Sequence, residues 1–339
     1  MTEITDLSPT DSSNTAVTGE SIDGAIANMG RMDNTLQAIL GLMARSIRTN
    51  VMRFLDNTDD TKRVALDLSG IPTATTRTWT APYYSGTLGL VSDIRGQIYG
   101  LTLSNNVTDP TNDIDIAAGS AVDSTGATSM LLASALTKRA DAVWAAGTNQ
   151  GGRFYTTLAD GWIYLYEIRN PNTGVVDVGF SDNATTPTGG ASYPAGFTQF
   201  RYIGPIARVG GVIRQFRQNG DVFMWATPVA DLGSTIIGAT STTVAVSAPA
   251  NRVTTAILTG VVAHATPGNG IYVRALNQDD VAVGGASVTA TAQVAGLGLT
   301  WAKNVETNTS SQIAVRAGAA TTTITVNCLG FIDTRNRNA

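Results

Sequence analysis

The sequence has few charged residues, one cysteine and one histidine. Charged residues make up 14% of its 339 residues and the formal net charge is −4, so the chain as a whole would repel a polyanion such as nucleic acid. Cys328 cannot form a disulfide within one chain, and we expect a buried structural thiol. His264, in GVVAHATPGNG, cannot by itself form a histidine-rich metal cluster, and we expect it to be a structural or turn residue.

Long apolar runs and export signals are also missing. No apolar segment approaches the roughly 18 residues of a membrane-spanning helix. The first residues, MTEITDLSPTDSSNTAVTG, have neither the basic start nor the apolar core of a secretory signal. We therefore expect a soluble chain that is made in the cytoplasm and does not insert into membranes. Apolar residues still make up 43% of the sequence, which is enough for folded domains.

Motifs for catalysis and cofactor binding are absent or ambiguous. No GxSxG, P-loop or GxGxxG pattern stands in a strand-turn-helix setting, so the sequence predicts no catalytic residue and no cofactor. Glycoside hydrolysis needs only two carboxylates about 5 to 10 Å apart. No pattern selects such a pair among the acids of the aromatic region, which are Asp141, Asp160, Glu167, Asp177, Asp182 and Asp221.

One acidic segment is a candidate cation site. TDPTNDIDI places Asp109, Asn112, Asp113 and Asp115 close together, and oxygen ligands of this kind bind calcium. The segment lacks the glycine at position 6 and the glutamate at position 12 of an EF-hand loop. A polar turn is the favoured interpretation, no metal ligand is assigned, and the sequence leaves ion binding open.

The first 50 residues predict an arm followed by a helix. Residues 1–20 are polar and predict an extended arm that orders against a partner. In residues 21–50, with Ser21 as N-cap, the apolar positions are spaced by three and four, which predicts an amphipathic helix with a seam close to a heptad pattern. The seam residues are Ile22, Ile26, Met29, Met32, Leu36, Ile39, Met43 and Ile47. The seam needs a partner, which is another copy of the chain, another protein, or the chain's own remainder.

Residues 55–92 predict a short β stem segment. Val64, Leu66 and Leu68 alternate with polar residues, and Pro72 and Pro82 interrupt the pattern. Strands this short do not bury a core within one chain, so we expect neighbouring copies to complete them.

Residues 93–228 predict a central antiparallel β domain rich in aromatic residues. DGWIYLYEI, residues 160–168, alternates as a strand, with Trp162, Tyr164 and Tyr166 on one face. RNPNTGVVDVGFS predicts a turn at residues 170–174 and a returning strand. LLASALTKRADAVWA, residues 131–145, predicts a short helix.

In residues 196–225, four arginines (Arg201, Arg208, Arg214, Arg217) alternate with aromatic residues. Single-strand nucleic-acid binders use this combination, but the acidic chain favours strands with the rings inside and the arginines at the surface. Aromatic residues beside polar loops can also bind sugars by stacking. The candidates for either the core or a binding surface are Trp162, Tyr164, Tyr166, Phe200, Tyr202 and Trp225.

Residues 230–339 predict a C-terminal β-sandwich or jelly roll. Six segments read as strands separated by Gly, Pro, Asn and Asp turns, which is typical of these folds. The segments are STTVAVSA, RVTTAILTGVVA, GIYVRALN, ASVTATAQVA, QIAVRAG and TTTITVNCLGFID.

Three segments resemble fibre and spike proteins of tailed bacteriophages. Residues 59–88, DDTKRVALDLSGIPTATTRTWTAPYYSGTL, resemble a threonine-rich strand pair that ends in a proline and a Ser-Gly-Thr turn. Residues 196–228, GFTQFRYIGPIARVGGVIRQFRQNGDVFMWATP, are similar to a module in which an aromatic-Arg-Tyr-Ile-Gly strand precedes a Phe-x-Gln-x-Gly-Asp turn. Residues 8–39 are similar to the virion-proximal arm and helix of such fibres.

The resemblance implies a homotrimer that attaches to other virion proteins through residues 1–50. It implies a C-terminal tip domain on the particle surface that contacts a host glycan or protein. The expected function is therefore a structural fibre or spike, with no enzymatic activity and no nucleic-acid partner. A head or neck component without host contact and a polysaccharide-degrading tailspike remain alternatives.

Overall fold

The structure is a computed structural model that describes residues 51–55, 58–59, 61–67, 76 and 96–337. The predicted arm and helix, and most of the predicted stem after residue 67, lie outside the described residues. The chain divides into two compact units, residues 1–87 and 88–339, and each is described by itself. In the first unit, β1 (Val51–Leu55) pairs antiparallel with β2 (Arg63–Asp67), which contains the predicted strand positions Val64 and Leu66.

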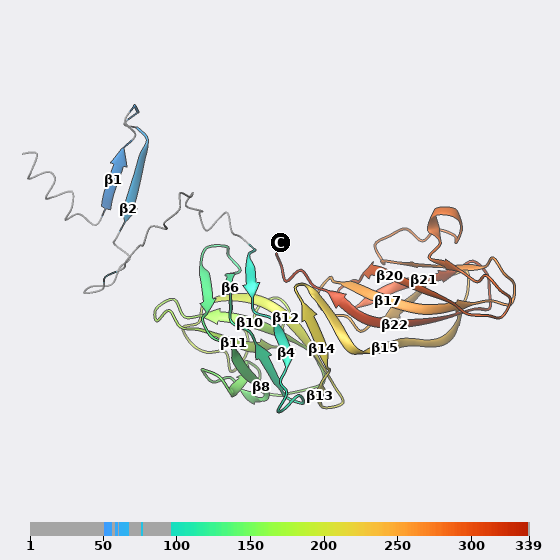
Figure 1. The fold of residues 1–339 in the computed structure, drawn as a ribbon, viewed down its shortest axis with the longest axis horizontal. Coiled ribbons are helices and arrows are strands. Elements are labelled where there is room, and N and C mark those ends of the chain that lie inside the picture. Colours follow the sequence, from blue (N-terminus) through green and yellow to red (C-terminus); the bar gives the residue numbers. More distant parts are fainter. Residues whose placement is uncertain (1–50, 56–57, 60, 68–75, 77–95, 338–339) are drawn as a thin grey trace, which may run out of the picture. The chain divides into compact units, whose positions relative to one another are not determined.

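The second unit is built almost entirely of strands (Figure 1), which confirms the prediction of a mainly β protein. We call residues 96–221 the central lobe and residues 238–332 the C-terminal lobe, and β15 (Val222–Ile237) belongs to both. The strands of the central lobe are β3 (Ile98–Gly100), β4 (Leu103–Asn105), β5 (Asp113–Ile116), β6 (Gly119–Val122), β7 (Ser129–Leu132), β8 (Leu136–Val143), β9 (Gln150–Arg153), β10 (Gly161–Arg169), β11 (Val176–Ser181), β12 (Gln199–Val209), β13 (Val212–Ile213) and β14 (Phe216–Asn219). Those of the C-terminal lobe are β16 (Thr242–Ala245), β17 (Thr255–Ala263), β18 (Gly270–Arg274), β19 (Ala290–Thr291), β20 (Leu299–Glu306), β21 (Gln312–Ala317) and β22 (Thr322–Ile332).

One large sheet runs through both lobes. It has 13 strands in the order β13-β12-β10-β11-β9-β8-β5-β4-β14-β15-β22-β17-β20. Because β15 pairs with β14 at its start and with β22 along most of its length, it carries the sheet from the central lobe into the C-terminal lobe (Figure 1). The predicted domain boundary near residue 230 falls inside this strand.

The faces of β10 follow the alternation expected from the sequence. Ile163 and Leu165 belong to the main hydrophobic core, while Tyr164 and Tyr166 belong to a second, aromatic cluster. The predicted hairpin is also present, because β10 pairs antiparallel with β11 and the Gly174 amide donates to the Asn170 carbonyl.

Two predictions for the central lobe were wrong. Residues 131–145 form the end of β7 and the whole of β8 rather than a helix, because Met130, Leu132 and Ala140 alternate into the core. The lobe is also mixed rather than purely antiparallel, since β9 runs parallel to both β8 and β11. The connection after β8 contains Gly147 and Asn149 in left-handed conformations, which helps to return the chain to the start of β8.

In the C-terminal lobe, two sheets contribute to one core. Leu258, Val262 and Ile324 of the large sheet and Val273 and Val315 of a four-stranded sheet, β16-β21-β18-β19, belong to the same buried cluster. All six predicted segments contain a strand, although ASVTATAQVA contributes only the two residues of β19. β20, which forms the edge of the large sheet, was not predicted from the sequence.

Candidate functional site

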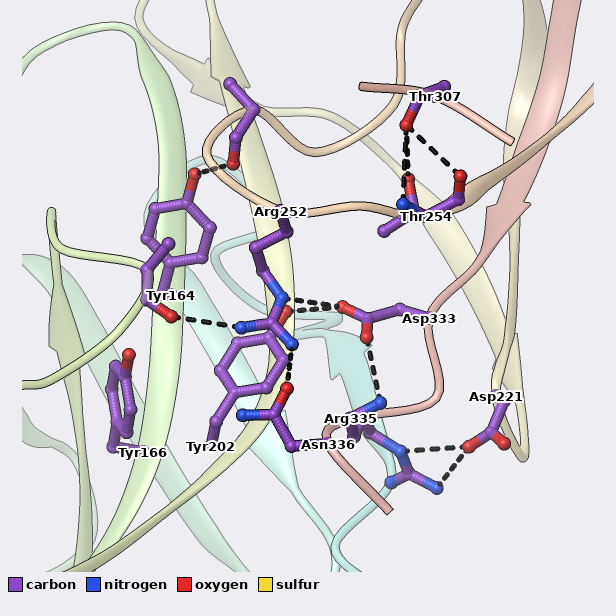
Figure 2. Close-up of polar contacts among 12 residues, drawn as sticks. Tyr164, Tyr166, Tyr202, Asp221, Arg252, Thr254, Thr307, Asp333, Arg335 and Asn336 are labelled. Carbon is purple, nitrogen blue, oxygen red and sulfur yellow. Dashed lines mark hydrogen bonds and ion pairs between the residues drawn. The ribbon is translucent and has the colours of Figure 1, made fainter. Parts of the chain in front are cut away.

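The central and C-terminal lobes meet at buried and half-buried tyrosine, arginine and acidic side chains, which we call the joint cluster (Figure 2). Its members come from β10, β12, the β14–β15 turn, the loop before β17 and the segment after β22. They are Tyr164, Tyr166, Tyr202, Asp221, Arg252, Asp333, Arg335 and Asn336.

Arg252 lies at the centre of the joint cluster. Its guanidinium carbon is 3.8 Å from the ring centroid of Tyr202, and its Nε is 3.5 Å from Asp333 Oδ2. The Tyr202 hydroxyl donates to the same carboxylate oxygen at 2.6 Å. Burial, followed by the charge of Asp333, raises the pKa of Tyr202 well above its usual range, so the phenol keeps the proton that it donates.

A second set of contacts holds the segment after β22. Asp221 accepts hydrogen bonds from Arg335 Nη2 at 3.1 Å and from Arg337. The Arg335 amide donates to Asp333 Oδ1 at 2.8 Å, and Arg201 Nη2 donates to the Arg335 carbonyl at 3.0 Å. The end of the described chain is therefore fixed to β12 of the central lobe and to the turn before β15.

Tyr164 and Arg252 connect the two lobes, whereas Tyr166 bonds within the central lobe. Tyr164 donates to the carbonyl of Ala250, in the loop before β17, and Tyr166 donates to the Asn183 carbonyl at 3.0 Å. Arg252 Nη1 donates to the Ala184 carbonyl at 3.0 Å. Burial raises the pKa of Tyr164 to about 12. Its hydroxyl therefore keeps the proton that it donates, while its ring packs in the interior.

The candidate aromatic residues lie in the packed interior. Tyr164, Tyr166, Tyr202 and Trp225 are buried, and Trp162 and Phe200 are half-buried against them. The ring centroid of Trp162 lies 5.9 Å from that of Trp225 and 5.6 Å from that of Phe331. The geometry therefore supports the core interpretation over a stacking surface for sugars.

Three of the four arginines of residues 196–225 have partners within the fold. Arg201 is buried, Arg208 forms an ion pair with Asp160 at 2.8 Å, and Arg214 lies over the ring of Trp225 at 5.3 Å. Arg217, on β14, is exposed. The expectation that all four arginines lie at the surface was wrong for Arg201.

The acids of the aromatic region have structural contacts. Asp141 pairs with Arg139 at 3.0 Å and Asp177 with Lys138 at 2.8 Å. Lys138 is fully buried and burial lowers its pKa, an effect that Asp177 partly opposes. Asp160 and Asp221 pair with arginines as described above, and Asp182 is exposed.

Glu167 is the exception among these acids. It is 0% exposed on β10, and its two carboxyl oxygens have no hydrogen-bond partner of normal geometry among the described residues. Burial raises its pKa to about 9, although the backbones of Leu132 and Ala121 lower it in part. Glu167 is therefore a neutral acid in the folded chain at pH 7.

The acidic segment after β4 forms a polar turn. Asp109 Oδ1 accepts from the amides of Thr111 at 3.0 Å and Asn112 at 3.3 Å. Asp115 Oδ1 accepts from Thr137 Oγ1 at 2.7 Å, and burial, followed by the charge of Asp109, raises the pKa of Asp113. Within the described residues no group of three or more His, Cys, Asp or Glu side chains is placed to hold a metal ion.

The single histidine and cysteine have structural positions. His264 directly follows β17, and its Nδ1 accepts a hydrogen bond from the Thr266 amide at 2.9 Å. Cys328 is fully buried on β22, and burial, helped by the charge of Asp231, raises the pKa of its thiol to about 12. Both positions agree with the structural roles expected from the sequence.

Two overlapping hollows, of about 260 and 360 Å³, lie beside the end of β20. They share Ala275, Asn277 and Glu306, and Asn277 Nδ2 donates to Glu306 Oε1 at 2.9 Å. Val253 supplies an exposed apolar wall. This groove combines amide, carboxylate and apolar groups on the surface of the C-terminal lobe.

Arg252, Asp333 and Arg335 were not predicted from the sequence as site residues. The sequence feature that could have indicated them is the group of charged residues around Asp333, which follows C-terminal strands with few charges. No family model matches the chain, and no curated protein matches it. Among the described residues, no helix has the length and apolar character needed to cross a membrane.

Proposed function

We propose that the chain is a structural fibre or spike protein of a tailed-bacteriophage virion and not an enzyme. In this proposal, residues 1–50 attach the chain to other virion proteins, and copies associate as a homotrimer through the predicted helix seam. The C-terminal lobe, a β-sandwich tip, is exposed on the particle and contributes to attachment to the host surface. The resemblance of residues 8–39, 59–88 and 196–228 to such proteins is the starting point.

The observation that carries the proposal is the connection between the two lobes. A fibre must hold its exposed lobe in a fixed orientation, and lobes joined only by a linker would move independently. Here β15 carries one sheet through both lobes by pairing with β14 and with β22, and the joint cluster adds a buried charged hydrogen bond and an ion pair. Such bonds are the stronger kind and are costly to break when buried.

The structural contacts of the acids support a role without catalysis. A glycosidase needs two carboxyl groups that face a substrate. In the central lobe, Asp160 and Asp177 are held in ion pairs, and Glu167 is enclosed in the fold. Incubation of the purified chain with host surface polysaccharide should leave the polysaccharide chain length unchanged, and shortening would favour the tailspike alternative.

The groove beside β20 is the region of the C-terminal lobe that we propose for host contact. Planar amides and a carboxylate beside an apolar wall suit a glycan or a polar protein surface. Fab fragments raised against residues 230–339 should block adsorption of the particle, while an unrelated Fab should not. Normal adsorption with the fragments bound would favour a head or neck component without host contact.

A further inference from the structure

The outward side of the large sheet in the C-terminal lobe is nearly free of charge. Residues that face each other across an antiparallel pair lie on the same side of the sheet. Thr259 on β17 faces Asn327 on β22 and Ala302 on β20, and their neighbours in sequence, such as Leu258 and Cys328, face the core. We call the outward set the threonine face. It consists of Ala230, Ile236, Thr255, Ile257, Thr259, Val261, Ala263, Thr300, Ala302, Asn304, Glu306, Thr323, Thr325 and Asn327.

Every residue of the threonine face is exposed or half-buried, and none belongs to the buried core of the described chain. Ile236 is 67% exposed. Glu306, on the edge strand β20, is the only charged member. A surface of β-branched and small side chains with a single charge at its edge is unusual for a face in contact with water, and typical of a face that contacts another protein.

The other side of the C-terminal lobe differs. The outward positions of its four-stranded sheet include Arg316, which is half-buried, and Arg274, which other residues cover so that it is 5% exposed; they form ion pairs with Asp280 at 3.2 and 3.4 Å. Thr243 lies on that same side and is exposed. Only one of the two sheets therefore has an outward surface without a network of charges.

We propose that the threonine faces of the associated copies of this chain pack against one another around their common symmetry axis. Symmetric association brings each residue near the axis close to its own copy, so charged side chains there would repel. The threonine face avoids this repulsion. Thr259 Oγ1 donates to the Trp301 carbonyl and Thr325 Oγ1 accepts from the Val261 amide within the chain, but a hydroxyl keeps further lone pairs, and asparagine amides both donate and accept. The face can therefore form hydrogen bonds with itself, while its Ile and Val residues bury apolar surface.

The size of the threonine face fits this partner. Four strands about 4.8 Å apart and about nine residues long cover on the order of 600 Å², compared with about 800 Å² per partner in a standard interface. A contact of this size gains strength when the same copies are also joined elsewhere, because the second contact forms at high effective concentration. The inference concerns a surface other than the helix seam, and it does not depend on a role in a virion.

Thiol crosslinking tests the proposal in the full chain. Thr259 lies in the middle of the threonine face, so two copies of Thr259→Cys should lie near each other and react with one short bismaleimide. Cys328 is fully buried and should not react before denaturation. In a homotrimer one crosslinker joins two of the three copies, so we expect about two thirds of the Thr259→Cys chains to migrate as covalent pairs on a denaturing gel. The matched control is Thr243→Cys, on the opposite sheet, which should remain single.

The outcomes decide between the possible occupants of the face. If Thr259→Cys gives no more pairs than Thr243→Cys, the proposal is wrong, and the face is covered by another protein, by the chain's own residues 1–95, or by water. If light scattering then still shows an assembled chain, association lies elsewhere, and the proposed function can stand. Should Thr259→Cys fail to fold, Ala302→Cys, directly opposite on β20, serves in its place with the same expected result.

Discussion

Glu167 couples the folding of the chain to proton uptake. Its pKa is raised to about 9 by burial, from a usual value of 4.5, so between these values the folded chain holds a proton that the unfolded chain releases. For a raised acid pKa, the stabilising effect of the proton is complete below about pH 4.5 and is lost as the pH rises through about 9. Glu167 therefore makes the folded chain less stable in alkaline solution.

Glu167→Gln should remove this dependence on pH. Glutamine has nearly the shape of the protonated acid and cannot ionise, so we expect the free energy of unfolding at pH 7 to increase by roughly 3 kcal/mol. The gain should shrink toward pH 5. Urea unfolding at pH 5, 7 and 9 measures the effect. The control is Glu306→Gln, at an exposed carboxylate, which should change the free energy of unfolding by no more than about 0.5 kcal/mol. An equal change in the free energy of unfolding at all three pH values would contradict a raised pKa for Glu167.

Arg252 is the residue on which the joint cluster most depends. Arg252→Ala leaves Asp333, which is 2% exposed, without its cation, so we expect a loss of about 3 kcal/mol in the free energy of unfolding. Arg217→Ala, at an exposed arginine, should change it by less than about 0.5 kcal/mol. In a double-mutant cycle with Asp333→Asn, a coupling of more than about 1 kcal/mol is expected, and strictly additive losses would show that the pair is unimportant.

At the scale of elements, β22 depends on close approach to β15. A side-chain Cβ at Gly330 would lie 2.1 Å from the Phe223 carbonyl oxygen of β15, so Gly330→Ala should force the two strands apart. We expect Gly330→Ala to lower the free energy of unfolding by about 3 kcal/mol or more. Gly233→Ala on β15 is the matched control, because a Cβ there meets no atom within 4 Å. Thermal unfolding measures both, and similar midpoints would show that the strands separate without cost.

The alternation of residue types predicts single elements well when it is strict. Trp162 to Ile168 alternate between two packed faces, and the sequence predicts both the strand and its hairpin partner. Residues 131–145 have good helix formers, yet pairing of β8 with β5 and β9 overrides that local preference. β20 was not predicted because only two of its residues, Trp301 and Val305, are apolar and buried. The polar residues Lys303, Asn304 and Glu306 beside them leave no clear alternation in the sequence.

At the scale of the whole molecule, the joint cluster could not be predicted because its partners are far apart in sequence. Tyr202 and Asp333 are separated by 131 residues, and Arg335 and Asp221 by 114. Local patterns carry no information about which distant side chains meet. A buried arginine looks the same in the sequence as an exposed one, so Arg201 and Arg217 were given the same expected position.

The shared sheet and the joint cluster predict that the two lobes unfold together. Opening the C-terminal lobe separates β15 from β22 and leaves Tyr202 and Asp221 of the central lobe without their partners. Native-state hydrogen exchange in increasing urea should therefore give the same global midpoint for β10 and for β17.

A mutation in one lobe makes this test sharper. Val273→Ala creates a cavity in the core of the C-terminal lobe and should lower the free energy of unfolding by about 2 kcal/mol. If the lobes form one cooperative unit, the midpoint of β10 in the distant lobe should fall by the same amount as that of β17. A fall confined to β17 would mean that the lobes unfold separately, and the connection between them would then be too weak to hold an exposed lobe in a fixed orientation.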